Sequence, residues 1–139
     1  MRLSLIFAGF LLASPAAAAP RQQLDTLSPA QAISRAASSA PNPVRALFQF
    51  KVQNAAKSRD GYYLDSEKDF RSAANLGVAI KASAMPGLTQ KYGADLKSAF
   101  VGKTIKLIGQ VRRVPVGKNG SATATQVEVT HAGQILSAD

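Results

Sequence analysis

Three acidic residues, Asp65, Glu67 and Asp69, alternate along one short polar stretch. Alternating carboxylates of this kind can supply oxygen ligands to a hard cation. The calcium-loop pattern also requires a glycine directly after the third acidic position, and Phe70 stands there instead. The stretch is therefore predicted to be a solvated turn or a cap for the next element. Binding of a small cation or small molecule near residues 65–69 is the weaker alternative.

Other catalytic or metal-binding residues are scarce. The chain has one histidine, His131, and no cysteine, so it lacks a thiol nucleophile and the side-chain cluster that a transition metal requires. It also lacks a G-x-S-x-G elbow, a phosphate-binding Walker loop and a paired set of catalytic acids. We expect no enzymatic activity, no cofactor and no metal site.

Basic residues are abundant, with 17 Lys and Arg against 8 Asp and Glu. A surface with such an excess of positive charge attracts anionic partners. Candidate partners are single-stranded nucleic acid, another anionic polymer, or an acidic protein. The competing interpretation is that the charge only keeps the protein soluble.

The first residues have the three parts of an export signal: Arg2, an apolar run over residues 3–12, and small residues that end in Ala16-Ala17-Ala18. The apolar run is about half the length of a membrane-spanning helix. We therefore predict a signal peptide over residues 1–18, cleaved near Ala18, no stable membrane anchor, and a periplasmic or secreted protein. Cleavage removes Arg2, which leaves 16 basic and 8 acidic residues.

The mature chain is predicted to begin with a leader segment, residues 19–43, followed by one domain over residues 44–139. Ser28 and Pro29 open a short helix in the leader, as an N-cap and first helical residue. Alternating hydrophobicity then predicts strands near residues 44–52, 62–64 and 76–80. Leu88, Tyr92, Leu96 and Phe100 recur every four residues and predict a helix, which precedes two further strands near residues 103–112 and 125–129.

Three strands, a helix and two strands are the element order of the five-stranded oligonucleotide/oligosaccharide-binding barrel, the OB-fold. We therefore expect an all-β, five-stranded OB-fold barrel with a helix between strands three and four, preceded by the short N-terminal helix. The helix would close one end of the barrel with its single apolar stripe.

The sequence also resembles small bacterial exported OB-fold proteins. The resemblance is carried by residues 61–71 (GYYLDSEKDFR), 75–80 (NLGVAI), 100–111 (FVGKTIKLIGQV), 126–130 (QVEVT) and Gln134-Ile135, and covers about residues 43–136. These proteins are similar to anticodon-type nucleic-acid-binding OB domains and to the periplasmic bacterial OB-fold family. The resemblance implies a binding module, and it transfers no catalytic residue.

Candidate ligand-binding residues follow from strand alternation. Outward positions on the first three strands, on the fourth strand and in the loop after it are predicted to form one basic face: Arg45, Gln49, Lys51, Tyr63, Lys81 and Lys106 on the strands, and Arg112, Arg113 and Lys118 in the loop. Single-stranded nucleic acid binds to such a face when it also offers aromatic rings on which bases stack, and Tyr63 is the one ring expected to point outward. The alternative function is docking of an acidic envelope protein, as an interaction or structural module.

Overall fold

The computed structural model describes residues 23–139, so the predicted signal peptide and its cleavage site lie outside the described residues. The alternating segment that begins at Val44 forms strand β2 (Val44–Lys51). Ala46, Phe48 and Phe50 are buried on one side of β2, whereas Arg45, Gln49 and Lys51 are exposed on the other. One face of the strand therefore packs on the core and the other contacts solvent.

The remaining strands join β2 in a single sheet. They are β1 (Thr26–Leu27), β3 (Asn54–Lys57), β4 (Tyr62–Asp65), β5 (Leu76–Ile80), β6 (Thr104–Val116), β7 (Ala122–Val129) and β8 (Ile135–Ala138). The order is β1-β2-β6-β7-β5-β4-β3, with β8 paired to β6. Neighbouring strands are antiparallel except for the pairs β1/β2 and β5/β7.

The expectation of an all-β, five-stranded barrel is wrong. The described residues form a mixed α/β structure with eight strands in one open sheet and three α-helices. The additional strands are β1, β3 and β8, which are short and carry too few alternating apolar residues to stand out in the sequence. The sheet ends at β1 on one side and at β3 on the other, so no ladder closes it.

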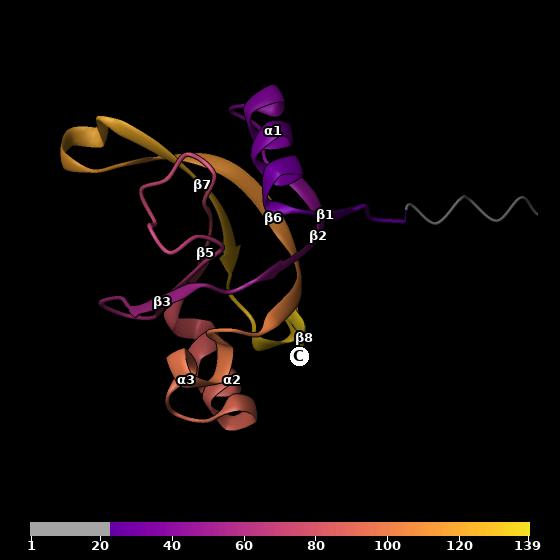
Figure 1. Ribbon diagram of the computed structural model, residues 1–139, viewed down its shortest axis with the longest axis vertical. Coiled ribbons are helices and arrows are strands. Elements are labelled where there is room, and N and C mark those ends of the chain that lie inside the picture. The colour runs from indigo at the N-terminus through magenta and orange to yellow at the C-terminus, as the bar shows by residue number, and fades with distance from the viewer. Residues whose placement is uncertain (1–22) are drawn as a thin grey trace, which may run out of the picture.

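Helix α1 (Pro29–Ser39) lies at one end of the sheet, at the top of Figure 1. It begins as the sequence predicts, because the Ser28 hydroxyl accepts a hydrogen bond from the Gln31 N–H. Ala32 and Ala36 form its buried stripe. Together with Leu27 of β1, they pack into the same core as the strands.

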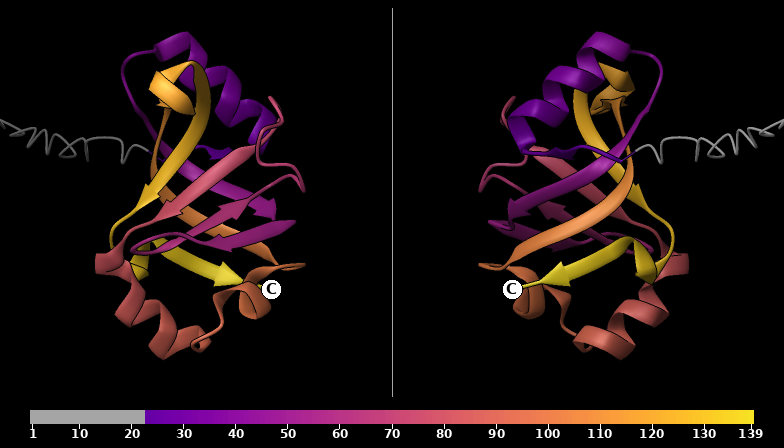
Figure 2. Two further views of the ribbon diagram at one scale, coloured as in Figure 1. Left: turned by 90° about the vertical axis from the view of Figure 1, so that its left-hand side faces the viewer. Right: turned by 90° about the vertical axis from the view of Figure 1, so that its right-hand side faces the viewer.

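The predicted helix over residues 88–100 is two helices, α2 (Met85–Tyr92) and α3 (Leu96–Phe100). Gly93 separates them with a φ of 100°, a left-handed conformation that glycine adopts without steric cost. Leu88, Leu96 and Phe100 are fully buried. Both helices lie at the end of the sheet opposite α1 (Figures 1 and 2).

Short 3₁₀ helices occupy residues Ala82–Ala84, Lys118–Gly120 and Ala132–Gln134. The last of them lies between β7 and β8 and places Gln134 beside β6. No helix within residues 23–139 is both long enough and apolar enough to cross a membrane.

Candidate functional site: a basic strand face and an adjoining groove

The outer face of β2 and β6 carries four of the predicted binding residues. The antiparallel register places Gln49 opposite Lys106, Arg45 opposite Gln110, and Lys51 opposite Thr104. Side chains opposite each other in an antiparallel pair lie on the same face of the sheet. Arg45, Gln49, Lys51 and Lys106 therefore share one surface, which we call the basic face.

Arg112 extends the basic face towards β7. Its guanidinium forms an ion pair with the Glu128 carboxylate at 3.5 Å, and both side chains are about half exposed. Among the lysines and arginines that the structure describes, the only other ion pair joins Arg35 of α1 to Asp25. Arg45, Lys51 and Lys106 are thus free to contact an external anion.

Two other predicted residues lie elsewhere. The prediction that Arg112 and Arg113 belong to a loop is wrong, because β6 continues to Val116. Arg113 follows Arg112 in a regular ladder with β7 and so points to the opposite face, where it donates to Thr123 Oγ1 at 2.6 Å. Lys118 lies at the exposed tip of the β6–β7 hairpin.

Tyr63 and Lys81 are also separate from the basic face. Tyr63 lies on β4, four positions from β2 in the order of the sheet. Its cross-strand neighbours are Ala56 and Ala79, whose methyl groups are too small to cover the ring, and it is 41 % exposed. Lys81 follows β5 and is exposed, and its backbone N–H donates to the Val129 carbonyl.

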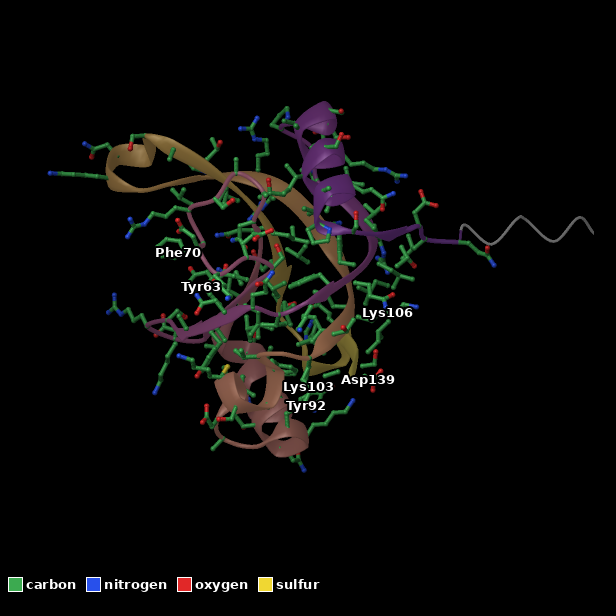
Figure 3. The ribbon with its side chains drawn as sticks, in the orientation of Figure 1. Tyr63, Phe70, Tyr92, Lys103, Lys106 and Asp139 are labelled. Atoms are coloured by element: carbon green, nitrogen blue, oxygen red, sulfur yellow. The ribbon has the colours of Figure 1, made fainter. Side chains whose placement is uncertain are left out.

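Phe70 is an exposed aromatic residue that sequence reasoning missed. It is 58 % exposed in the loop between β4 and β5, and the Arg71 guanidinium lies 5.3 Å from the centre of its ring. Figure 3 shows Phe70 and Tyr63 on the same side of the molecule. The available signal was a single aromatic residue flanked by charged Asp69 and Arg71, a context that disfavours burial.

The acidic stretch 65–69 does not form a ligand set. Asp65 is only 5 % exposed, and its carboxylate accepts hydrogen bonds from the side-chain amides of Asn75 at 3.0 Å and Asn54 at 3.2 Å. Burial raises the pKa of Asp65 above its ordinary value, and these two hydrogen bonds oppose the increase. Asp69 instead accepts from the Arg71 backbone N–H. Over residues 23–139, no three His, Cys, Asp or Glu side chains are grouped so that they could hold a metal ion.

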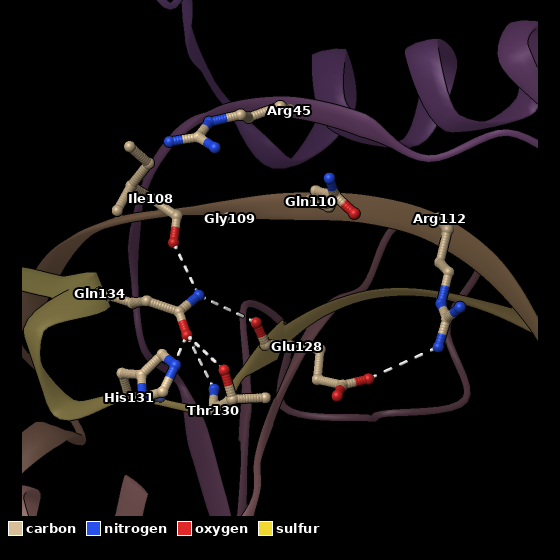
Figure 4. Close-up of a pocket in the computed structure, with 9 residues that line it drawn as sticks. All are labelled: Arg45, Ile108, Gly109, Gln110, Arg112, Glu128, Thr130, His131 and Gln134. Atoms are coloured by element: carbon tan, nitrogen blue, oxygen red, sulfur yellow. Dashed lines mark hydrogen bonds and ion pairs between the residues drawn. The ribbon is translucent and has the colours of Figure 1, made fainter.

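An open groove of about 510 Å³ adjoins the basic face where β6 separates from β7 (Figure 4). Arg45 and Ile108 lie at one end, Arg112 and Glu128 at the other, and Gln110 between them. Gly109, Thr130, His131 and Gln134 complete its lining, and the His131 side chain is exposed there.

Gln134 builds the floor of this groove. Its side-chain Nε2 donates to the carbonyls of Ile108 at 3.0 Å and Glu128 at 3.1 Å. Its Oε1 accepts from the backbone N–H groups of Thr130 and His131. One amide thus replaces the ladder hydrogen bonds that β6 and β7 lose where they separate, and it holds both strands in position.

Comparison with models of known protein families and with curated proteins finds no match to this chain.

Proposed function

We propose that this chain is a non-catalytic binding protein for an anionic polymer, with single-stranded nucleic acid as the leading ligand, and that the polymer lies along the basic face. The observation that supports the proposal most is the register of β2 and β6, which groups Arg45, Lys51 and Lys106, none of which has an acidic partner among residues 23–139. Cations in this arrangement can contact successive phosphates of an extended strand.

Two acidic residues border the basic face and limit its length. Glu128 lies at one end, beside Arg112. Asp139 lies at the other end, where its backbone N–H and carbonyl pair with those of Thr104. A strand bound between these borders would contact the three cations of the face and Arg112 beside it, and we expect it to run along the strand direction of β6.

Tyr63 offers a second contact for a longer ligand. Glu128, Ala79 and Tyr63 lie in one cross-strand row over β7, β5 and β4, so Tyr63 is on the same side of the sheet as the groove, with buried Ala79 between them. Bases stack on exposed aromatic rings with little dependence on sequence. We propose that a long strand extends from the basic face to this side of β4 and stacks one base on Tyr63.

The direct test is a fluorescence anisotropy titration of a labelled single-stranded 20-mer at about 50 mM salt, where contacts to phosphate are strong. The double variant Arg45→Ala/Lys106→Ala should bind several-fold more weakly than the wild type. Lys91→Ala/Lys97→Ala is the matched control, because it removes the same charge from α2 and α3 at the end of the molecule. Equal weakening by both variants, or no binding by the wild type, would overturn the proposal.

The alternative partner, an acidic envelope protein, gives a different result. The acidic protein would bind with a saturable stoichiometry of one partner per chain. In that case the affinity for oligonucleotides would not increase with their length. Export is part of the same proposal: protein recovered from the periplasm or medium should have the mass of a chain that begins at Ala19.

A further inference from the structure

The groove beside the basic face contains an acidic side chain in an otherwise cationic setting. Glu128 Oε2 accepts from Arg112 at 3.5 Å, and its Oε1 has no hydrogen-bond partner within the described part of the chain. An ion pair this long and this exposed contributes about 0–1 kcal/mol and leaves the carboxylate available to another donor. A carboxylate so placed repels phosphate, so a ligand that enters the groove must bring a hydrogen-bond donor to it.

The opposite end of the groove has complementary chemistry. Arg45 offers donors only, and its planar guanidinium can stack on a flat ring. Ile108 adds an apolar surface next to it, and Gln110, opposite Arg45 in the ladder, has an amide that both donates and accepts. The groove thus has the Glu128 carboxylate beside Arg112 at one end, the Gln110 amide in the middle and the Arg45 guanidinium at the other end.

This arrangement matches the edge of an amino-bearing nucleobase. Cytosine carries an N4 amine that donates to a carboxylate, next to ring atoms that accept from an amide or a guanidinium. Uracil carries a carbonyl in place of the amine, which would set one acceptor against another. Unstacked bases of single strands are recognised through these edges.

We infer that the groove binds one base of the strand and selects bases with an exocyclic amine, cytosine foremost, over uracil. The inference rests on the proposed function and adds a specificity to it. Glu128 accepts from the amine, Gln110 and Arg45 face the acceptor atoms, and Ile108 contacts the face of the ring. Gln134 does not take part in selection, because both ends of its amide are committed to backbone groups.

The test compares labelled oligodeoxycytidine and oligodeoxyuridine 15-mers, which differ at the group that Glu128 would read. Wild-type protein should bind the deoxycytidine strand about fivefold more tightly or better, the lower end of the discrimination given by one good base contact. In Glu128→Gln the new amide can donate to the uracil carbonyl as well as accept from the amine, so the preference should fall to about one.

Glu67→Gln is the control, because it removes one negative charge from the loop between β4 and β5, outside the groove. Both variants should strengthen binding of each oligonucleotide, but Glu67→Gln should leave the cytosine preference intact. Equal binding of the two strands by wild-type protein overturns this inference and leaves the proposed function standing. A failure of both strands to bind overturns the proposed function, and the inference with it.

Discussion

The side-chain amide of Gln134 lies in space that Gly109 leaves open on β6. A Cβ added at residue 109 would stand 3.3 Å from Gln134 Nε2 and 2.8 Å from Val127 Cγ1. The glycine therefore leaves room for the Gln134 amide at the point where it joins β6 and β7. The groove therefore depends on both residues, although 24 residues of chain lie between Gly109 and Gln134.

Replacement of Gln134 by alanine should destabilise the fold. The carbonyls of Ile108 and Glu128 and the N–H groups of Thr130 and His131 would lose their partner. Unsatisfied groups at a partly buried site cost about 1–3 kcal/mol, so we expect a loss of that order in urea unfolding. Gln126→Ala on β7 is the control, since the Gln126 side chain makes no hydrogen bond to the described residues. Similar losses for the two variants would contradict the role given to Gln134.

Gly109→Ala should also destabilise the protein, for a steric reason. The added methyl would overlap Val127 and press on the Gln134 amide, and overpacking of this kind costs about 1–3 kcal/mol. Gly133→Ala is a matched comparison, because a Cβ there meets nothing within 4 Å and should change stability by less than about 0.5 kcal/mol. Thermal unfolding of the two variants checks this, and equal melting temperatures would refute it.

The sequence predicted the strands with strong alternation. Val44 to Lys51 alternates over eight residues, so its inward and outward sides could be assigned before any register was known. That assignment placed Arg45, Gln49 and Lys51 on the outer face. The buried helix positions Leu88, Leu96 and Phe100 followed from the spacing of four, but the break at Gly93 did not, because an isolated glycine is tolerated within many helices.

The parts that the sequence did not predict depend on long-range contacts. Strand β3 has the composition of a loop, and it becomes a strand because its backbone pairs with β4. The groove depends on Gln134, whose amide bonds to Ile108, 26 positions earlier. Local patterns carry no information about such a contact. Tyr63 was correctly expected to point outward, but its separation from Arg45 follows from the strand order alone.

Stability should depend on pH through Asp65. Burial raises the pKa of Asp65 in the folded state above its value in the unfolded chain, so the folded state binds a proton at Asp65 more tightly than the unfolded state does. The stabilisation from this proton is fully present when the pH is below the pKa of Asp65 in the unfolded chain, near 3.8. It is lost as the pH rises through the higher pKa of the folded state. Wild-type protein should therefore lose stability relative to Asp65→Asn as the pH increases from about 3.5 to 7. Urea unfolding across that range measures it, with exposed Asp69→Asn as the control; a constant difference between wild type and Asp65→Asn would argue against it.

Tyr63 should matter only for long ligands. It lies three strands from β6 in the order of the sheet, or about 14 Å at the usual strand spacing. A strand of about five nucleotides that occupies the basic face should not reach it, whereas a 15-mer should. Tyr63→Ala should weaken binding of the 15-mer by about fivefold or more, the loss of one stacked base, and leave the short strand unaffected. Anisotropy titrations of the short strand and of the 15-mer measure this effect. An equal loss of affinity for both strands would mean that Tyr63 contacts the ligand at the basic face itself.

Salt dependence gives the most direct measure of phosphate contacts. Binding to a single strand weakens with salt by a logarithmic slope of about 0.7 for each phosphate that a cation neutralises. Arg45→Ala/Lys106→Ala removes two such cations and should lower the magnitude of the slope by about 1.4. Lys91→Ala/Lys97→Ala should leave the slope unchanged, although it reduces the net charge of the protein equally. Titrations between about 50 and 200 mM salt separate the two outcomes. If both double variants lower the slope to the same extent, binding follows total charge, and the register of β2 and β6 has no special part in it.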